Sequence, residues 1–212
     1  MLKKSSVSLT IVFLIGLSGC AGVSHIQLSD KARSEVQTVT INSNIQVNQE
    51  ILLYGMTQAT AGAVGGAVGG LVGEALVADD KTLLKSLIEK NEIKVDRIFY
   101  VKLKSQLEES KIFPKVADQS GDAVFNISIA SYGLFKKSTF STGLRAAVWA
   151  DVSLTRSNGE IIWQKRFKPE MSEDRLPAHA LAYYQQHPEI LRNGYEMAME
   201  IIAKEIVADL KG

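Results

Sequence analysis

A strict alternation of side chains over residues 144–154 constrains the fold more than any other feature of the chain. Every second position is apolar, namely Leu144, Ala146, Val148, Ala150, Val152 and Leu154. Successive side chains of a β-strand point to opposite faces of the sheet, so this pattern predicts a strand with one buried face. The opposite phase carries Arg145, Trp149 and Asp151, and we expect it to face outward.

Other segments supply partners for this strand. They are residues 37–41, 45–47, 125–130 and 161–167. Asn158-Gly159 lies between residues 144–154 and 161–167, and it predicts a tight hairpin because both residues tolerate a positive φ. Asn42-Ser43-Asn44 has turn composition. Together these segments predict an antiparallel sheet of about four strands.

Helices are predicted where apolar residues recur at three or four positions. These segments are residues 83–90, 96–110, 178–186 and 188–210. Asp79 or Asp80 is a suitable N-cap for the first helix and Asp96 for the second, while Pro188 suits the first turn of the last. We therefore predict an α+β fold, with helices packed on the sheet, in a single domain over residues 36–212.

Residues 56–78 form an apolar, glycine-rich segment in which Glu74 is the only charged residue. Its glycines fall into two series with a spacing of four, Gly62-Gly66-Gly70 and Gly65-Gly69-Gly73. On a helix they would form one face, of the kind that lets helix backbones approach closely in membranes. The alternatives are a loop and packing within the domain, since glycines in a water-exposed helix cost about 1 kcal/mol each relative to alanine.

The N-terminus has the order of an export signal. Lys3 and Lys4 precede the short apolar run 9–17, and Leu17-Ser18-Gly19-Cys20 follows. The run is shorter than the ~20 residues that span a bilayer. Leu17-Ser18-Gly19-Cys20 resembles the bacterial lipobox, which implies a signal peptide over residues 1–19 and a diacylglyceryl and palmitate modification of Cys20. An ordinary signal peptide is the alternative.

Cys20 is the only cysteine in the chain, so no intramolecular disulfide is possible. Residues 20–35 are polar and weakly patterned, and we expect them to form a tether between the lipid and the domain. Ala21 and Gly22 follow the cysteine, without the Asp that retains bacterial lipoproteins in the inner membrane. By resemblance, the protein is expected at the outer membrane, anchored by lipid and facing the periplasm.

Catalytic and metal-binding signatures are absent from the sequence. The histidines are His25, His179 and His187, and neither His-Glu-x-x-His nor Gly-x-Ser-x-Gly occurs. His179 and His187 would share a helix face only if Pro188 did not interrupt it; surface or capping roles are the alternative. We therefore expect no enzyme, no metal, no small-molecule substrate and no cofactor beyond the lipid. The formal net charge of +1 gives no reason to expect a nucleic-acid partner.

Several polar residues have two interpretations each. One set is Asp118, Asp122 and Asp151. These carboxylates could form a catalytic pair, or they could be ordinary solvated groups in turns and on a strand surface. Lys136-Lys137 with Arg145 is an anion site or a solubilising cluster. Trp149 belongs to a partner surface or is covered by another part of this chain.

Beyond the lipobox, residues 96–113 with Asp122-Ala123-Val124-Phe125 and the hairpin resemble the helix-then-strands core of penicillin-binding-protein activator and lipopolysaccharide-assembly lipoproteins. The glycine segment is similar in kind to that of surface-exclusion lipoproteins. These resemblances imply a non-catalytic envelope protein that binds an envelope protein partner or self-assembles as a homo-oligomer. The alternative is a membrane-inserting oligomer or pore component that uses helix 56–78.

Overall fold

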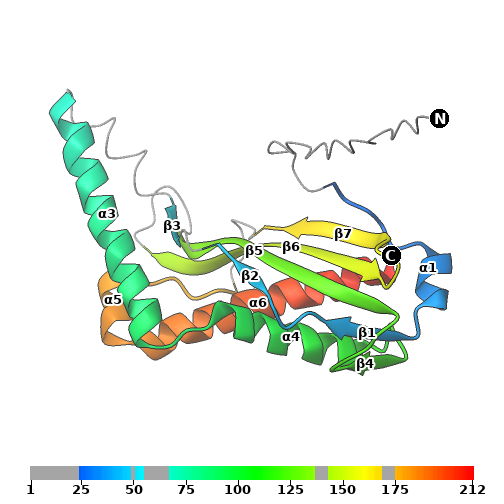
Figure 1. Ribbon diagram of the computed structural model, residues 1–212. Coiled ribbons are helices and arrows are strands. Elements are labelled where there is room, and N and C mark those ends of the chain that lie inside the picture. The colour runs from blue at the N-terminus through cyan, green and yellow to red at the C-terminus, as the bar shows by residue number, and fades with distance from the viewer. Residues whose placement is uncertain (1–23, 49–50, 55–66, 137–142, 169–174) are drawn as a thin grey trace, which may run out of the picture.

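The computed structural model describes residues 24–48, 51–54, 67–136, 143–168 and 175–212, with the backbone alone for Tyr54 and residues 67–78. Figure 1 shows two layers, a long twisted sheet and a helical layer beneath it. The helical layer consists mainly of α4 (Val95–Ser110) and α6 (Pro188–Lys211), which lie side by side under the sheet. This arrangement confirms the α+β class.

Within the described ranges the sheet has seven strands, in the order β4-β1-β5-β6-β7, with β2 and β3 also pairing with β5. Its antiparallel part consists of β5 (Ala123–Lys136), β6 (Leu144–Arg156) and β7 (Ile161–Phe167). Its parallel part consists of β1 (Thr38–Ile41), β2 (Gln46–Val47), β3 (Ile51–Tyr54) and β4 (Lys115–Ala117). The expected antiparallel sheet of about four strands was therefore wrong, because the sheet is mixed and larger.

Three short strands follow one edge of β5 in turn. Thr40 pairs with Val124, Gln46 with Ser128, and Leu53 with Leu134. Asn42-Ser43-Asn44 interrupts this edge but keeps its contact, because the Asn42 N–H donates to the Phe125 carbonyl at 2.9 Å. The turn therefore divides one long parallel edge and does not reverse the chain.

The predicted hairpin between β6 and β7 is confirmed. Gly159 has a φ of 88°, and the Asn158 side chain accepts the Glu160 N–H at 3.0 Å. On the other side of β6, strand β5 extends to Lys136, past the expected end at residue 130. A register shift between Ile129 and Ser131 changes which residues face the helices and hides the later part of the strand from a period-two pattern.

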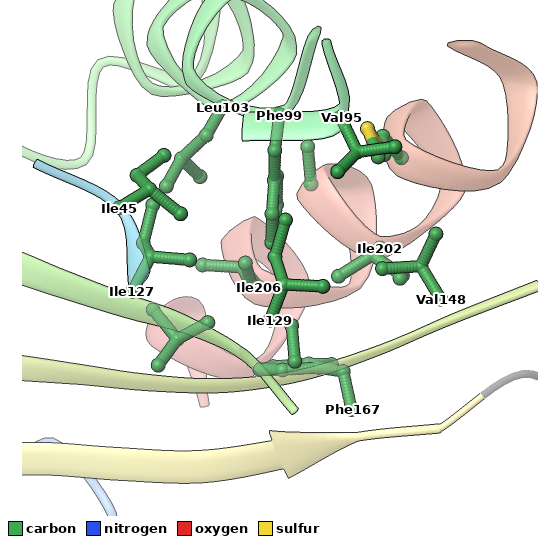
Figure 2. Close-up of a cluster of buried hydrophobic side chains, with 14 of the residues drawn as sticks. Ile45, Val95, Phe99, Leu103, Ile127, Ile129, Val148, Phe167, Ile202 and Ile206 are labelled. Carbon is green, nitrogen blue, oxygen red and sulfur yellow. The ribbon is translucent and has the colours of Figure 1, made fainter. Parts of the chain in front are cut away.

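The core lies between the helices and one face of the sheet. Figure 2 shows Phe99 and Leu103 of α4 and Ile202 and Ile206 of α6 directed at Ile127, Ile129 and Val148 of the sheet. Phe99, Leu103, Ile129, Val148 and Ile206 are completely buried. Burying a large apolar side chain contributes ~1.5–3 kcal/mol, so this interface stabilises the packing of the helices on the sheet.

Helix α3 (Ala67–Lys90) passes through Asp79-Asp80 without a break. The expected N-cap there was wrong, because the helix had already begun in the glycine segment and α3 includes Gly69, Gly70 and Gly73. Its C-terminal part packs through Leu84 and Ile88 and lies beside α5 (Leu181–Gln186), while its N-terminal end extends away from the sheet (Figure 1).

Two further helix starts are settled by the structure. Lys94 occupies the N-cap position of α4 without a side-chain cap hydrogen bond, and Asp96 lies in the first turn, so the expected N-cap at Asp96 was wrong by two positions. Pro188 is the first residue of α6, as predicted. Within the segment expected to be a tether, Ser29 caps a short helix, α1 (Asp30–Glu35), and Leu28 and Ala32 are buried. Residues 26–35 are therefore part of the folded domain.

Candidate functional site

The face of the sheet opposite the helices carries a polar hollow of about 210 Å³, which we call the sheet groove. Its lining side chains are amides, hydroxyls and one carboxylate, from Asn42, Asn44, Gln46, Asn126, Ser128, Asp151, Ser153 and Gln164. Ile127 and Val152 also line it, although they are almost fully buried. The groove runs across β2, β5, β6 and β7.

Strand register places these residues in two rows across the sheet. One row is Gln46-Ser128-Asp151-Arg166 and the other is Asn126-Ser153-Gln164. Asn and Asp are depleted in β-strands, yet Asn126 and Asp151 occupy the interior strands β5 and β6. Short side chains at these central positions leave the space that forms the groove.

A chain of hydrogen bonds fixes one end of the sheet groove. The Asn44 N–H donates to Asn42 Oδ1 at 3.0 Å, and Asn42 Nδ2 donates to Asn126 Oδ1 at 3.2 Å. Asn126 Nδ2 then donates to Thr155 Oγ1 at 3.2 Å. The Asn126 amide is thus held in one orientation by partners on two other elements.

The charge at the centre of the groove is compensated. Arg166 Nε and Nη2 each donate to the Asp151 carboxylate at 2.6 Å, in a bidentate pair. The hydrogen bond to Asp151 raises the pKa of the Arg166 guanidinium. Asp151 is therefore part of an ion pair and has no second carboxylate beside it among the lining residues.

Two hydroxyls in the groove remain available. Within the described part of the chain, no protein group hydrogen-bonds to the side chains of Ser128 or Ser153. Both side chains are partly exposed. Their register partners across β5 and β6 are Asp151 and Asn126, so donors and acceptors of different kinds lie next to one another.

The start of the folded chain forms one rim of the groove. Ile26 makes an antiparallel bridge to Gln164 through backbone hydrogen bonds of 2.8 and 2.9 Å. The Gln164 side chain donates to the Ser24 carbonyl at 3.1 Å. Only residues 21–23 separate Ser24 from Cys20, so the rim lies within about 14 Å of Cys20 even if this stretch is fully extended.

Trp149 lies two residues before Asp151 in β6, so its side chain is on the same face of the sheet, and it is half-buried. Its ring centroid is 5.6 Å from that of Phe135. Arg145 was expected to face outward with Trp149, but it is 2% exposed and has an interaction partner. The expectation that Arg145 faces outward was therefore wrong, and Lys137, the neighbour of Lys136 in the possible anion site, lies outside the described residues.

The residues singled out for lipidation and helix packing are only partly described. Cys20, Gly62, Gly65 and Gly66 lie outside the described residues. Gly69, Gly70 and Gly73 lie in α3, which gives them a helical backbone. No helix in the described part of the chain is long and apolar enough to cross a membrane.

The histidines have structural contacts. His179 stacks on Tyr183 with ring centroids 4.4 Å apart, and the His187 ring also packs against Tyr183, with centroids 4.5 Å apart. His25 pairs with Asp209 at 3.3 Å. Among the described residues, no cluster of three or more His, Cys, Asp or Glu side chains is arranged to hold a metal ion.

Asp118 and Asp122 make the contacts expected of ordinary turn carboxylates. Asp122 accepts the backbone N–H groups of Gln37 and Thr38 at 3.0 and 2.8 Å. Asp118 pairs with Lys104, and this hydrogen bond lowers the pKa of the Asp118 carboxyl. Asp118 and Asp122 are thus engaged separately, and neither is among the residues that line the sheet groove.

The sheet groove was not predicted from the sequence. The available signal was Asn126, Ser128, Asp151 and Ser153, which share the outward phase of two predicted strands. Strands favour β-branched and aromatic side chains, so a run of short polar residues on one face of two strands is unusual for a surface that only contacts solvent. Their assembly into one site depends on the pairing register of β5 and β6, which the alternation alone does not give.

No protein-family model matches the chain, and no curated protein is similar to it. Solved structures with some likeness include XCC0632 from Xanthomonas campestris, a DUF330 protein (12% identity, 53% of this chain and 58% of that chain, TM-score 0.39). A minor lipoprotein from Acinetobacter baumannii has 8% identity, 82% and 94% coverage, and a TM-score of 0.38. The PelC dodecamer from Paraburkholderia phytofirmans has 11% identity, 84% and 94% coverage, and a TM-score of 0.33.

The chain thus spans 58% of the length of the Xanthomonas protein.

Proposed function

We propose that the protein is a non-catalytic bacterial envelope lipoprotein, anchored through Cys20 to the outer membrane, which binds an envelope partner in the sheet groove. The observation that carries this proposal is the bridge between Ile26 and Gln164. It joins the start of the folded chain, just after the lipobox-like Leu17-Ser18-Gly19-Cys20, to the rim of the groove.

The short connection has a direct consequence for orientation. A lipid on Cys20 would hold the β7 edge of the sheet within about 14 Å of the anchored residue. Two or more acyl chains anchor a protein stably, because each buried methylene contributes ~0.8 kcal/mol. The groove would then open close to the membrane surface, and the domain would not sample a large volume on a long tether.

The anchor is tested with Cys20→Ser, because serine cannot form the thioether. We expect the wild-type protein to incorporate labelled palmitate and to remain with the outer membrane after a high-pH wash. The variant should incorporate none and should be released or remain uncleaved. Retention of Cys20→Ser in washed membranes would contradict the anchor and direct attention to residues 56–78. Ser105→Ala, on α4 and far from the N-terminus in sequence, is a suitable control for expression and folding.

A second candidate function is self-association through the glycine face, as a membrane-inserting oligomer or pore component. The favouring observation is that Gly69 and Gly73, four residues apart, lie on the continuous helix α3. Leu at both positions should favour an isolated helix but hold two helix axes apart. Crosslinked oligomers of the full chain should therefore decrease in Gly69→Leu/Gly73→Leu. A wild-type protein that forms no crosslinked oligomer would exclude this candidate.

A further inference from the structure

We infer that the sheet groove binds an uncharged, hydroxyl-rich chain, that is, a neutral glycan. This inference rests on the proposed function, in that it names the partner class of the same groove. The lining side chains supply amide N–H donors, amide oxygens and hydroxyls that both donate and accept. Sugar hydroxyls also donate and accept, so each can pair with either kind of group.

The charge balance argues against an ionic ligand. Among the described residues, Asp151 is the one charged residue that lines the groove, and Arg166 satisfies it with two bonds of 2.6 Å. An anionic ligand would have to compete with Asp151 for this guanidinium. A cationic ligand would have to displace Arg166 from the carboxylate. A neutral ligand needs neither change.

The direction of the groove argues against a peptide added as a strand. Strand addition uses the backbone groups along a sheet edge. The sheet groove instead crosses from Gln46 of β2 to Gln164 of β7, a width of three inter-strand spacings or about 14 Å. A short oligosaccharide lying across the strands would meet both rows of polar side chains.

The groove is also rigid and has an aromatic neighbour. Bonds from Asn42 and to Thr155 hold the Asn126 amide in place, so little side-chain freedom is lost on binding. The half-buried Trp149 lies on the same phase of β6 as Asp151, next to the row that contains Ser128. Its position makes it a reporter of binding, because the other tryptophan, Trp163, is completely buried.

The test uses the full-length lipidated protein in a detergent without a sugar headgroup. Probes are maltohexaose, tetra-N-acetylchitotetraose and oligogalacturonate, which separate hydroxyl, acetamido and anionic recognition. We expect a saturable change in tryptophan emission, and a matching calorimetric signal, with at least one of the two neutral probes below about 10 mM. Trp149→Phe should remove the change in emission.

Ser128→Val and Ser153→Val provide the decisive variants. Each removes a hydroxyl and adds a better strand former, so the melting temperature should hold or rise while affinity falls about two- to tenfold. Ser105→Ala, which removes a hydroxyl from α4 on the opposite layer, should leave affinity unchanged.

Three results would overturn the inference: no binding of either neutral probe, binding of oligogalacturonate alone, or neutral-probe affinity that is unchanged in both valine variants. Failure of glycan binding with intact Cys20-dependent membrane retention would remove only this inference. Loss of retention without loss of binding would remove only the anchor.

Discussion

The indole nitrogen of Trp163 donates a hydrogen bond of 2.8 Å to the Asp209 carboxylate, and this contact joins β7 to the end of α6. Lys165 and His25 also contact the same carboxylate. Asp209 therefore links the last strand, the last helix and the beginning of the folded chain. Since His25 precedes the bridge at Ile26, this cluster also helps to hold the N-terminal segment against the domain.

The stability of the Asp209 cluster should depend on pH. Burial alone would raise the pKa of Asp209, but hydrogen bonds from Lys165 and Trp163 outweigh it and hold the pKa below its ordinary value of 3.8. A depressed pKa in the folded state contributes stability that is present above the unfolded value and is lost as the pH falls through the folded value.

Asp209→Asn tests this dependence. We expect the variant to be less stable than wild type by about 1–2 kcal/mol at pH 7. The difference should shrink as the pH falls below 4, since the wild-type carboxyl then becomes protonated. Urea unfolding at pH 7, 5 and 3 measures it. A difference that stays constant over this range would mean that the ionised carboxylate is not the stabilising form.

Gly133→Ala should disrupt the parallel edge of the sheet. An added Cβ would lie 1.7 Å from the Leu52 carbonyl oxygen, so β3 would have to separate from β5. We expect a loss of about 3 kcal/mol or more, or an insoluble protein. Gly194→Ala is the matched control, since its Cβ would meet only the Ala146 side chain at 3.2 Å. That variant should stay within about 1 kcal/mol of wild type, and equal effects at both sites would contradict the β3–β5 pairing.

Gly159→Val should destabilise the domain by about 1 kcal/mol or more, because a β-branched residue resists the positive φ of the turn. In the part of the chain that the structure describes, nothing lies within 4 Å of the position where a Cβ would be, so the cost comes from the backbone conformation. Gly159→Asn should restore much of the stability, since Asn tolerates positive φ. Thermal unfolding compares the variants. An unchanged melting temperature in Gly159→Val would mean that this turn does not require a residue that tolerates positive φ.

Local patterns in the sequence predicted the parts of the fold that depend on local chemistry. The alternation over residues 144–154 and Asn158-Gly159 correctly gave β6 and the hairpin to β7. The parallel pairing of β1 with β5, between Val39 and Ala123 for example, was missed because partners so distant in sequence leave no local signal. The second half of β5 was missed because the register shift near Ala130 changes the phase of the alternation between apolar and polar residues.

A predicted helix start was wrong where a residue pair with the composition of a cap lies inside a longer helix. Asp79-Asp80 has the composition of a cap, but a helix already formed upstream continues through it, because propagation costs less than a new nucleus. The sheet groove was missed for a different reason. Ser128 and Asp151 are 23 positions apart in sequence but are direct partners across β5 and β6, and only the register shows it.

If the anchored protein binds its partner in the sheet groove, photocrosslinking in intact cells should capture that partner there. A photoreactive amino acid replaces Ser153 in the groove or, as a control, Ser105 on α4, in the wild-type and Cys20→Ser backgrounds. We predict a crosslinked product from position 153 that requires Cys20 and that glycan-degrading treatment removes, with no such product from position 105. A product from position 105 alone would contradict binding in the sheet groove. A product from position 153 that is unaffected by Cys20→Ser would contradict the requirement for the anchor.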